Sequence, residues 1–234
     1  MQYDHVKKAI FRLRPNRFIA QCELEGKQVE AHVRNTGRCR ELLIPGCTVY
    51  LLEDFRPGRK TQYTLISVEK SGRMVNIDSL APNKIFREAM MEGDIQLPGF
   101  EVPCTVLKPE TRFGDSRFDF YMENSSQKAF VEVKGVTLED DGVVLFPDAP
   151  TERGVKHIRE LCRAAEEGYL AYLIFVVQMK NVRYFTPNRQ THSAFGEALE
   201  AARKSGVTLL AFDCHVTANE IWLNEPVEIV LTVQ

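Results

Sequence analysis

The stretch FDFYMENSSQKAFVEVK, Phe118–Lys134, decides the fold of the second half of this chain. Its two runs, Phe118–Glu123 and Lys128–Lys134, are rich in Phe, Tyr and Val, which is typical of β-strands. Four polar residues separate the runs, so we expect a β-hairpin with a four-residue loop. Counting back from that loop places Asp119 directly opposite Glu132.

Two carboxylates in this position need a physical reason, because like charges opposite each other destabilise a sheet. A divalent cation bound between Asp119 and Glu132 would remove the repulsion, and their hard oxygens suit Mg²⁺ or Mn²⁺. Lys134 is expected on the same face, where it would orient an attacking water or offset charge on phosphorus. The alternative is a solvated face with different pairing, because the D…ExK spacing is short and common.

Length and composition are those of an ordinary globular protein. The chain has 234 residues, of which 44% are hydrophobic and 26% charged, enough for one large domain or two small ones. No apolar run reaches membrane-spanning length, and the N-terminus lacks the apolar segment of a signal peptide. The six cysteines contain no CxxC pair, so we expect free thiols and a cytoplasmic location.

Charge is unevenly distributed along the chain. Residues 1–73 carry 14 Lys and Arg against 8 Asp and Glu, whereas the rest carries 16 against 24. A basic first third would attract phosphates, and an acidic remainder would hold a metal. Asymmetry of this size is also common in proteins that bind no nucleic acid.

The first third is predicted to be a small β-barrel of the OB type. Short strand candidates with turn residues between them follow at close intervals: 9–13, 18–24, 28–32, 48–53 and 63–70. Barrels of this type bind single strands or nucleic-acid backbones through basic and aromatic side chains. Residues 1–80 are expected to form this domain, and residues 81–234 a second one.

The loop after the third strand is a candidate nucleic-acid site. It holds three arginines within seven residues, and Arg34, Asn35 and Arg38 are the residues that we expect to contact a phosphate backbone. The alternative is an ordinary solvated loop.

Residues 81–234 are predicted to form a mixed α/β sheet covered by helices on both faces. Helices are expected at 83–92, 152–167 and 191–205, and residues 95–111 are expected to be irregular. The continuous apolar run YLAYLIFVV, Tyr169–Val177, predicts a buried central strand. The first helix carries Glu88, which could reach a metal site, and the second carries Lys156 and His157 off its apolar stripe.

Taken together, these residues resemble the PD-(D/E)XK nuclease superfamily, whose core is a helix with a Glu, a hairpin with Asp and (D/E)xK, and a following helix and strand. More narrowly, the chain is similar to the sugar fermentation stimulation protein A (SfsA) family. This resemblance rests on three segments: HVRNTGRCRELLIPG (32–46), RFDFYMENSSQKAFVEVKGVTL (117–138) and FPDAPTERGVKHIREL (146–161). The last of them holds a long, specific motif.

The resemblance implies an OB domain fused to a restriction-endonuclease-like domain in a DNA-binding protein that is associated with bacterial sugar (maltose) metabolism. It implies that Asp119 and Glu132 bind Mg²⁺ or Mn²⁺ and that Lys134 assists the attacking water. Glu88 would bind or orient the metal. DNA contacts would be supplied by Arg117, Lys156 and His157.

Two functions therefore compete: a metal-dependent deoxyribonuclease, and a DNA-binding regulator of sugar-metabolism genes without turnover. A carbohydrate-binding module is not supported, because the single tryptophan, Trp222, lies outside the expected barrel. We expect no membrane association. The sequence leaves the oligomeric state open, a homodimer included.

Overall fold

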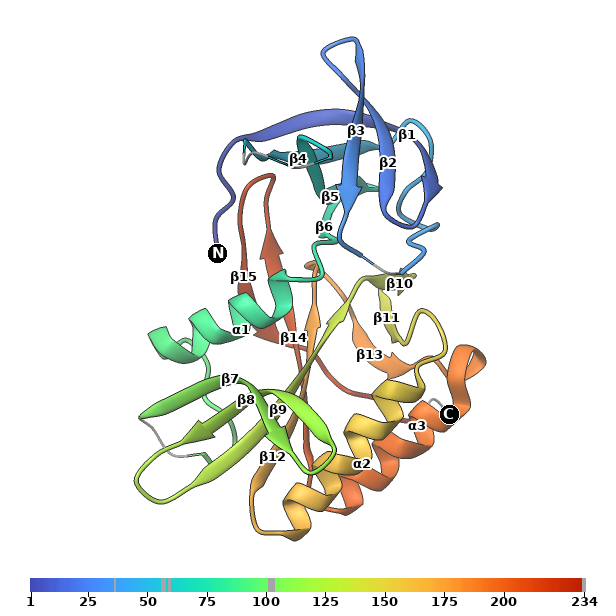
Figure 1. Cartoon of the computed structure of the whole chain (residues 1–234). Helices are drawn as coiled ribbons and strands as arrows, with labels where there is room; N and C mark the ends of the chain where they lie inside the picture. The colour runs from blue at the N-terminus through green and yellow to red at the C-terminus, as the bar shows by residue number, and fades with distance from the viewer. Residues whose placement is uncertain (36, 56–57, 59, 101–103, 233–234) are drawn as a thin grey trace.

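A computed structural model of the chain describes residues 1–35, 37–55, 58, 60–100 and 104–232. It contains a small barrel built on the N-terminal strands and a larger mixed sheet flanked by helices (Figure 1). The strands of the barrel half are β1 (Val6–Asn16), β2 (Ile19–Leu24), β3 (Lys27–Val33), β4 (Thr48–Glu53), β5 (Tyr63–Lys70) and β6 (Arg73–Asn76). Then follow α1 (Ala81–Glu92), β7 (Val106–Phe113), β8 (Ser116–Glu123), β9 (Lys128–Val136), β10 (Leu138–Asp140), β11 (Val143–Phe146), α2 (Glu152–Glu166), β12 (Leu170–Val177), β13 (Tyr184–Pro187), α3 (Arg189–Lys204), β14 (Thr208–Val216) and β15 (Ile221–Pro226).

The barrel is closed. Its strands run in the order β3-β2-β1-β4-β5, and a parallel pairing of β3 with β5 joins the two ends of the sheet. Closure removes exposed strand edges and matches the predicted OB-type barrel. The short strand β6 adds to β5 outside the closed ring and leads the chain into α1.

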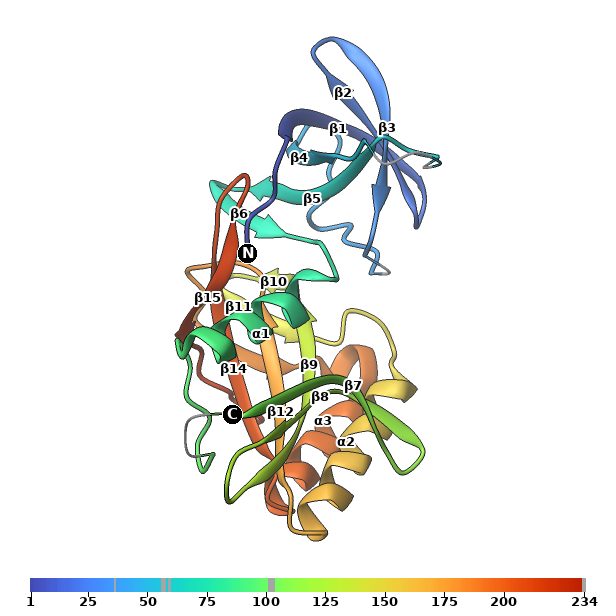
Figure 2. The same ribbon diagram turned by 60° about the vertical axis from the view of Figure 1, so that its left-hand side comes forward.

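The second half is built on the six-stranded sheet β15-β14-β12-β9-β8-β7, whose centre is parallel and whose edges are antiparallel. The predicted central strand is confirmed as β12, which is buried along nearly its whole length. Alternate β12 side chains pack on different layers: one set lies with α2 and α3, the other with α1 (Figure 2). The first set is Leu173, Phe175 and Val177, and the second is Tyr172, Ile174 and Val176.

One expectation about this half is wrong. Residues 95–111 were predicted to be irregular because of their prolines, yet residues from Val106 onward form the edge strand β7. Pro109 is accommodated there because only one side of an edge strand pairs with a neighbour. Helix α1 also begins two residues earlier than predicted, at Ala81, with Pro82 in its first turn.

A buried polar cluster joins the two halves. Asn76, at the end of β6, donates hydrogen bonds to the hydroxyls of Tyr3 and Ser67 and accepts one from Gln178, which follows β12. Gln178 also donates to the carbonyl of Asp78. The first residues of the chain lie against the β14–β15 hairpin, where the Tyr3 amide donates to the Asn219 carbonyl.

A second link uses charge. Glu139 of β10 forms ion pairs of 3.1 Å with Lys70 and Arg73 of the barrel half. These links hold the barrel on the upper end of the sheet, as Figure 1 shows. The helices among the described residues all fall short of the length and apolar character that a membrane span requires.

Candidate functional site

The hairpin has the predicted alignment for most of its length. Glu123 pairs with Lys128 and Tyr121 with Phe130, and the amide of Asn124 closes the loop on the Gln127 carbonyl. The ladder then ends one pair short of Asp119 and Glu132. Because the strands separate there, a cavity of about 230 Å³ opens beside the two acids.

We call this cavity the carboxylate pocket. Its polar wall residues come from three layers of the fold. Those from α1, the β8–β9 hairpin and α2 are Asn83, Asp119, Glu132, Lys134, Arg153 and His157, and Ser79, Glu110 of β7 and Arg117 of β8 complete the polar lining.

Asp119 is held by neighbours on both sides. One carboxylate oxygen accepts the Val133 backbone N–H at 2.8 Å, which replaces the strand pairing lost there, and the other accepts the Asn83 side-chain amide at 2.8 Å. Burial, and then the negative charge of Glu132, raise the pKa of Asp119 above its usual value. The charge of Glu132 therefore opposes the ionisation of Asp119.

Glu132 is 3% exposed. Its Oε1 lies 2.5 Å from both Lys134 Nζ and His157 Nδ1. Burial alone would raise the pKa of Glu132, but the hydrogen bond with His157 and the charge of Lys134 outweigh it and lower the pKa. The second oxygen, Oε2, is buried and has no hydrogen-bond partner among the described residues.

Helix α2 contributes more than the sequence indicated. His157 was expected off the apolar stripe of α2, yet it is 6% exposed, because it lies one turn before the buried Leu161. The four-residue spacing between His157 and Leu161 was the sequence signal that could have placed His157 on the buried face of α2. Arg153, which we did not predict, lies one turn earlier, with its Nε 3.4 Å from His157 Nε2.

Three predicted residues do not line the interior of this pocket. Arg117 lies at its rim, 65% exposed, with its guanidinium 3.8 Å from Glu110. Lys156 points away and donates to the Asp115 carbonyl. Glu88 lies outside the pocket and forms an ion pair of 2.6 Å with the amino group of Met1.

The position of Glu88 has a geometric cause. Asn83 is the α1 residue that reaches Asp119, and Glu88 is five positions further along the helix. Five residues rotate a side chain by roughly 140° and advance it by about 7.5 Å, so the two cannot share a face.

A second cavity, of about 490 Å³, lies on the barrel, and we call it the arginine pocket. The second half of β1 with the β1–β2 turn forms one wall, and the segment 37–45 forms the other. They supply Phe11, Leu13, Arg14, Asn16 and Arg17 from the first element, and Gly37, Arg38, Arg40, Leu43 and Pro45 from the second.

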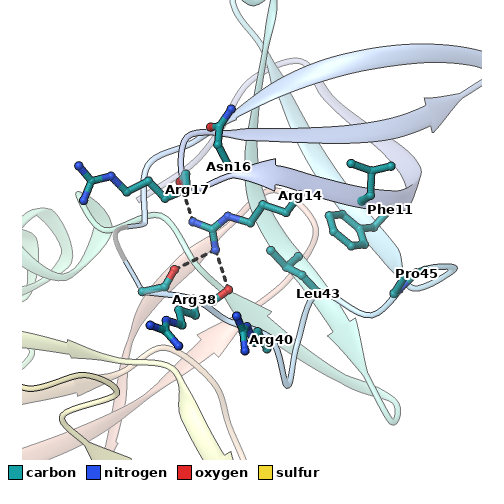
Figure 3. A pocket seen from close by; sticks show the side chains of 10 residues that line it. Phe11, Arg14, Asn16, Arg17, Arg38, Arg40, Leu43 and Pro45 are labelled. Carbon is teal, nitrogen blue, oxygen red and sulfur yellow. Dashed lines mark hydrogen bonds between the residues drawn. The ribbon is translucent and has the colours of Figure 1, made fainter.

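Arg14 joins the two walls of the arginine pocket (Figure 3). Its guanidinium donates to four backbone carbonyls at 2.7–2.8 Å, one from the β1–β2 turn and three from the segment after β3. They belong to Arg17, Asn35, Gly37 and Arg38. This arginine is structural, and the exposed cations of the pocket are Arg17, Arg38 and Arg40.

Of the three residues predicted to contact a backbone in this loop, only Arg38 presents its side chain to the arginine pocket. Arg34 turns inward and pairs with the buried carboxylate of Asp78 at 3.1 Å. Asn35 accepts the Gly37 amide and donates to the Ile77 carbonyl, so its side chain shapes the loop. Arg17 was missed because its segment was interpreted only as a turn.

A third cavity, of about 320 Å³, lies between these two pockets. It shares Gly37 with the arginine pocket, and Ser79, Pro82 and Gly135 with the carboxylate pocket. The barrel and the sheet therefore line a set of three adjoining hollows.

The carboxylate pocket fits a small divalent cation. Among the described residues there is no group of three or more His, Cys, Asp or Glu side chains arranged to hold a metal. Mg²⁺ needs fewer, because it usually takes one or two carboxylates and completes its shell with water and phosphate oxygens. The buried, unpartnered Oε2 of Glu132 beside Asp119 is an oxygen that such an ion would satisfy.

Comparison with known proteins identifies relatives over nearly the whole chain. A family described as "Sugar fermentation stimulation protein RE domain" matches residues 80–220, and "SfsA N-terminal OB domain" matches residues 13–77. A sugar fermentation stimulation protein homolog of Desulfitobacterium hafniense is 55% identical over 94% of each chain. One of Clostridium beijerinckii is 49% identical over 99% of this chain and 100% of that one.

A solved structure is similar as well. It is described as Pyrococcus furiosus SfsA in complex with Ca²⁺, and it matches with a TM-score of 0.88 and 31% identity over 98% of both chains. The family match covers more than half of this chain, and both named homologues align along almost their full lengths. The chain therefore belongs to the sugar fermentation stimulation protein (SfsA) family.

Proposed function

We propose that this protein binds DNA and that its carboxylate pocket holds Mg²⁺ or Mn²⁺ and hydrolyses phosphodiester bonds. The observation that carries the proposal is the buried, unpartnered Glu132 Oε2 in the same pocket as Asp119. A buried acid whose ionisation is opposed by a neighbouring carboxylate is expected where a cation is to be bound. The Ca²⁺ named for the Pyrococcus relative supports a hard, oxygen-bound cation.

When bound, such a cation lowers the pKa of a water and stabilises charge on the phosphate under attack. The side chains around it have separate roles. Lys134, bonded to Glu132 Oε1, places a positive charge where the phosphate would approach. Asn83 fixes the carboxylate of Asp119, and His157 fixes that of Glu132, so that both acids face the same space.

DNA is proposed as the substrate because phosphate-binding side chains line the same set of hollows as the acids. Arg153 and Arg117 border the carboxylate pocket, and Arg38 and Arg40 border the arginine pocket. Arginine forms two-pronged hydrogen bonds with phosphate, which positions a backbone without reading its sequence.

A second function is a DNA-binding regulator of sugar-metabolism genes that has no turnover. It is favoured by the small donor set, in which two carboxylates are the only acidic metal ligands proposed, and by the names of the homologues. This function keeps the cation as a structural ion beside bound phosphate.

One experiment separates the two functions. Mn²⁺ is titrated calorimetrically into the wild type, Glu132→Gln and the control Glu123→Gln, an acid at the far end of the same hairpin. The same samples are then incubated with Mn²⁺ and with duplex and single-stranded DNA. Saturable Mn²⁺ binding that is lost only in Glu132→Gln, together with DNA cleavage by the wild type, supports the nuclease. Binding without cleavage supports the regulator, and no specific Mn²⁺ binding contradicts the metal site.

For Asp119→Ala we predict that Mn²⁺-dependent cleavage falls by about 10³-fold or more, because metal stabilisation of the reaction is worth several kcal/mol. DNA affinity, measured by anisotropy in EDTA, is expected to stay within about twofold of wild type, because the phosphate-binding arginines are unchanged. Equal losses of cleavage and binding would count against a metal role for Asp119.

A further inference from the structure

The arginine pocket combines two chemistries that plain phosphate binding does not need. Its floor is apolar, with Phe11 and Leu43 buried and Leu13 46% exposed at its edge. Its rim is cationic, with the exposed Arg38 and Arg40 on one wall (Figure 3). Contact with a phosphate group buries little apolar surface on such a floor, whereas contact with the flat face of a base buries more and is therefore favourable.

The rim is free to bind an anion. Within the described residues, Arg17, Arg38 and Arg40 form no ion pair, and the lining of the pocket contains no carboxylate. Arg17 lies 4.8 Å from the ring centre of Phe18, which is 49% exposed. A stacked cation and an open aromatic ring therefore extend the surface beyond the pocket.

The pocket is preformed. The four hydrogen bonds of Arg14 tie the β1–β2 turn to the opposite wall, so the floor and the rim keep their spacing without a ligand. A volume of about 490 Å³ lies within the range of roughly 300–1,000 Å³ that ligand pockets occupy. Preformed walls reduce the entropy that binding must overcome.

These features distinguish a single strand from a duplex. A duplex presents its phosphates outward and keeps its bases stacked inside, so it would touch the rim and leave the floor unused. An unpaired nucleotide can place its base on apolar side chains and its phosphates on arginines at the same time. We propose that the arginine pocket holds one unpaired nucleotide of single-stranded DNA, with its base on Leu13 and Leu43 and its phosphates on Arg17, Arg38 and Arg40. The inference rests on the proposed function only in taking DNA as the ligand.

The test measures fluorescence anisotropy in EDTA, so that no step depends on a metal. The probes are a labelled single strand of about 12 nucleotides, within the range of OB-domain site sizes, and the blunt duplex of the same sequence. The charge variant is Arg38→Ala with Arg40→Ala, and its control is Arg203→Ala with Lys204→Ala on α3. The floor variant is Leu13→Ser, and its control is Leu80→Ser, another exposed leucine.

We expect the single strand to bind about tenfold more tightly than the duplex. The charge variant should weaken strand binding about tenfold and reduce the salt slope of its affinity by about 1.4, the value for two phosphate contacts on a single strand. Leu13→Ser should weaken strand binding by roughly three- to tenfold with the salt slope unchanged, because it removes apolar contact alone. The control variants should bind as the wild type does.

Equal affinity for strand and duplex, or equal losses for both in every variant, would overturn the inference and reduce the pocket to a backbone contact. An unchanged affinity in the charge variant would remove the pocket from the interface. In both cases, Mn²⁺-dependent cleavage of the duplex that is lost in Asp119→Ala would still support the proposed function. Failure of both DNA forms to bind would overturn this inference and DNA as the substrate together.

Discussion

At the scale of single residues, Asp119 and Glu132 share one pocket, but their charges affect stability with opposite signs. Burial and the charge of Glu132 raise the pKa of Asp119, so its ionisation costs stability as pH rises above its ordinary value of 3.8. Glu132 is also buried, but hydrogen bonding with His157 and the charge of Lys134 lower its pKa. Its charge therefore stabilises the fold above pH 4.5, and this contribution is lost as pH falls through the lowered pKa.

We predict that, at neutral pH without metal, Asp119→Asn raises the free energy of unfolding by about 1 kcal/mol, with the Asn83 amide turned so that its oxygen accepts from the introduced NH₂ group. Glu132→Gln should lower the free energy of unfolding by about 1.5–3 kcal/mol, the usual size of a hydrogen bond to a charged group. Urea unfolding followed by circular dichroism gives both values. Repeating it at decreasing pH should shrink the gain in Asp119→Asn, because the wild-type carboxyl then becomes increasingly protonated. Shifts of the same sign in both variants would contradict the opposite pKa directions.

Side chains of this pocket were predictable where they depend on local geometry. Asp119, Glu132 and Lys134 follow from counting along one hairpin, since alternation in a strand is fixed. Asn83 and Arg153 lie on helices whose faces depend on how those helices pack across the sheet, which spacing along the chain does not reveal.

At the scale of elements, the segment after β3 is fixed to the segment after β6 by Arg34 and Asp78. The Asp78 carboxylate is fully buried, and the Arg34 side chain is its cationic partner. We predict that Arg34→Ala lowers the free energy of unfolding by about 3 kcal/mol, because removing one partner leaves a buried charge uncompensated. The measurement is urea unfolding at neutral pH.

Arg38→Ala is the matched control, since this arginine is exposed a few residues away and has no ion-pair partner in the described chain. It should change stability by less than about 0.5 kcal/mol. A stable Arg34→Ala variant that loses DNA binding would restore the expectation that Arg34 contacts the backbone.

Elements with a strong internal pattern were predicted well. The apolar run that became β12 is buried on both faces, and such runs indicate central parallel strands. Strand β7 was missed because its exposed, proline-containing sequence lacks alternation. Only its pairing with β8 shows that it is a strand.

At the scale of the whole molecule, the barrel and the sheet share their interior. One contiguous apolar cluster includes barrel residues such as Leu65 and Val75 together with Phe175 and Phe185 of the sheet half. The barrel residues Tyr50 and Ile66 belong to the second cluster, with Phe86 of α1. The sequence indicated two domains from a change of pattern near residue 80, but such shared packing depends on contacts between distant segments.

Shared packing has a thermodynamic consequence. Domains that meet through small, wet interfaces unfold separately, whereas a common core makes unfolding of one half expose the other. We predict a single calorimetric transition for the whole chain, with equal van't Hoff and calorimetric enthalpies. Asn76→Ala, which removes buried hydrogen bonds to Tyr3, Ser67 and Gln178, should cost about 2 kcal/mol. That cost corresponds to a loss of about 4–8 °C in Tm for a chain of this size. The transition should stay single in this variant, because the apolar clusters remain. Two resolved transitions in the wild type would show that the barrel folds on its own and that the buried polar cluster only tethers it.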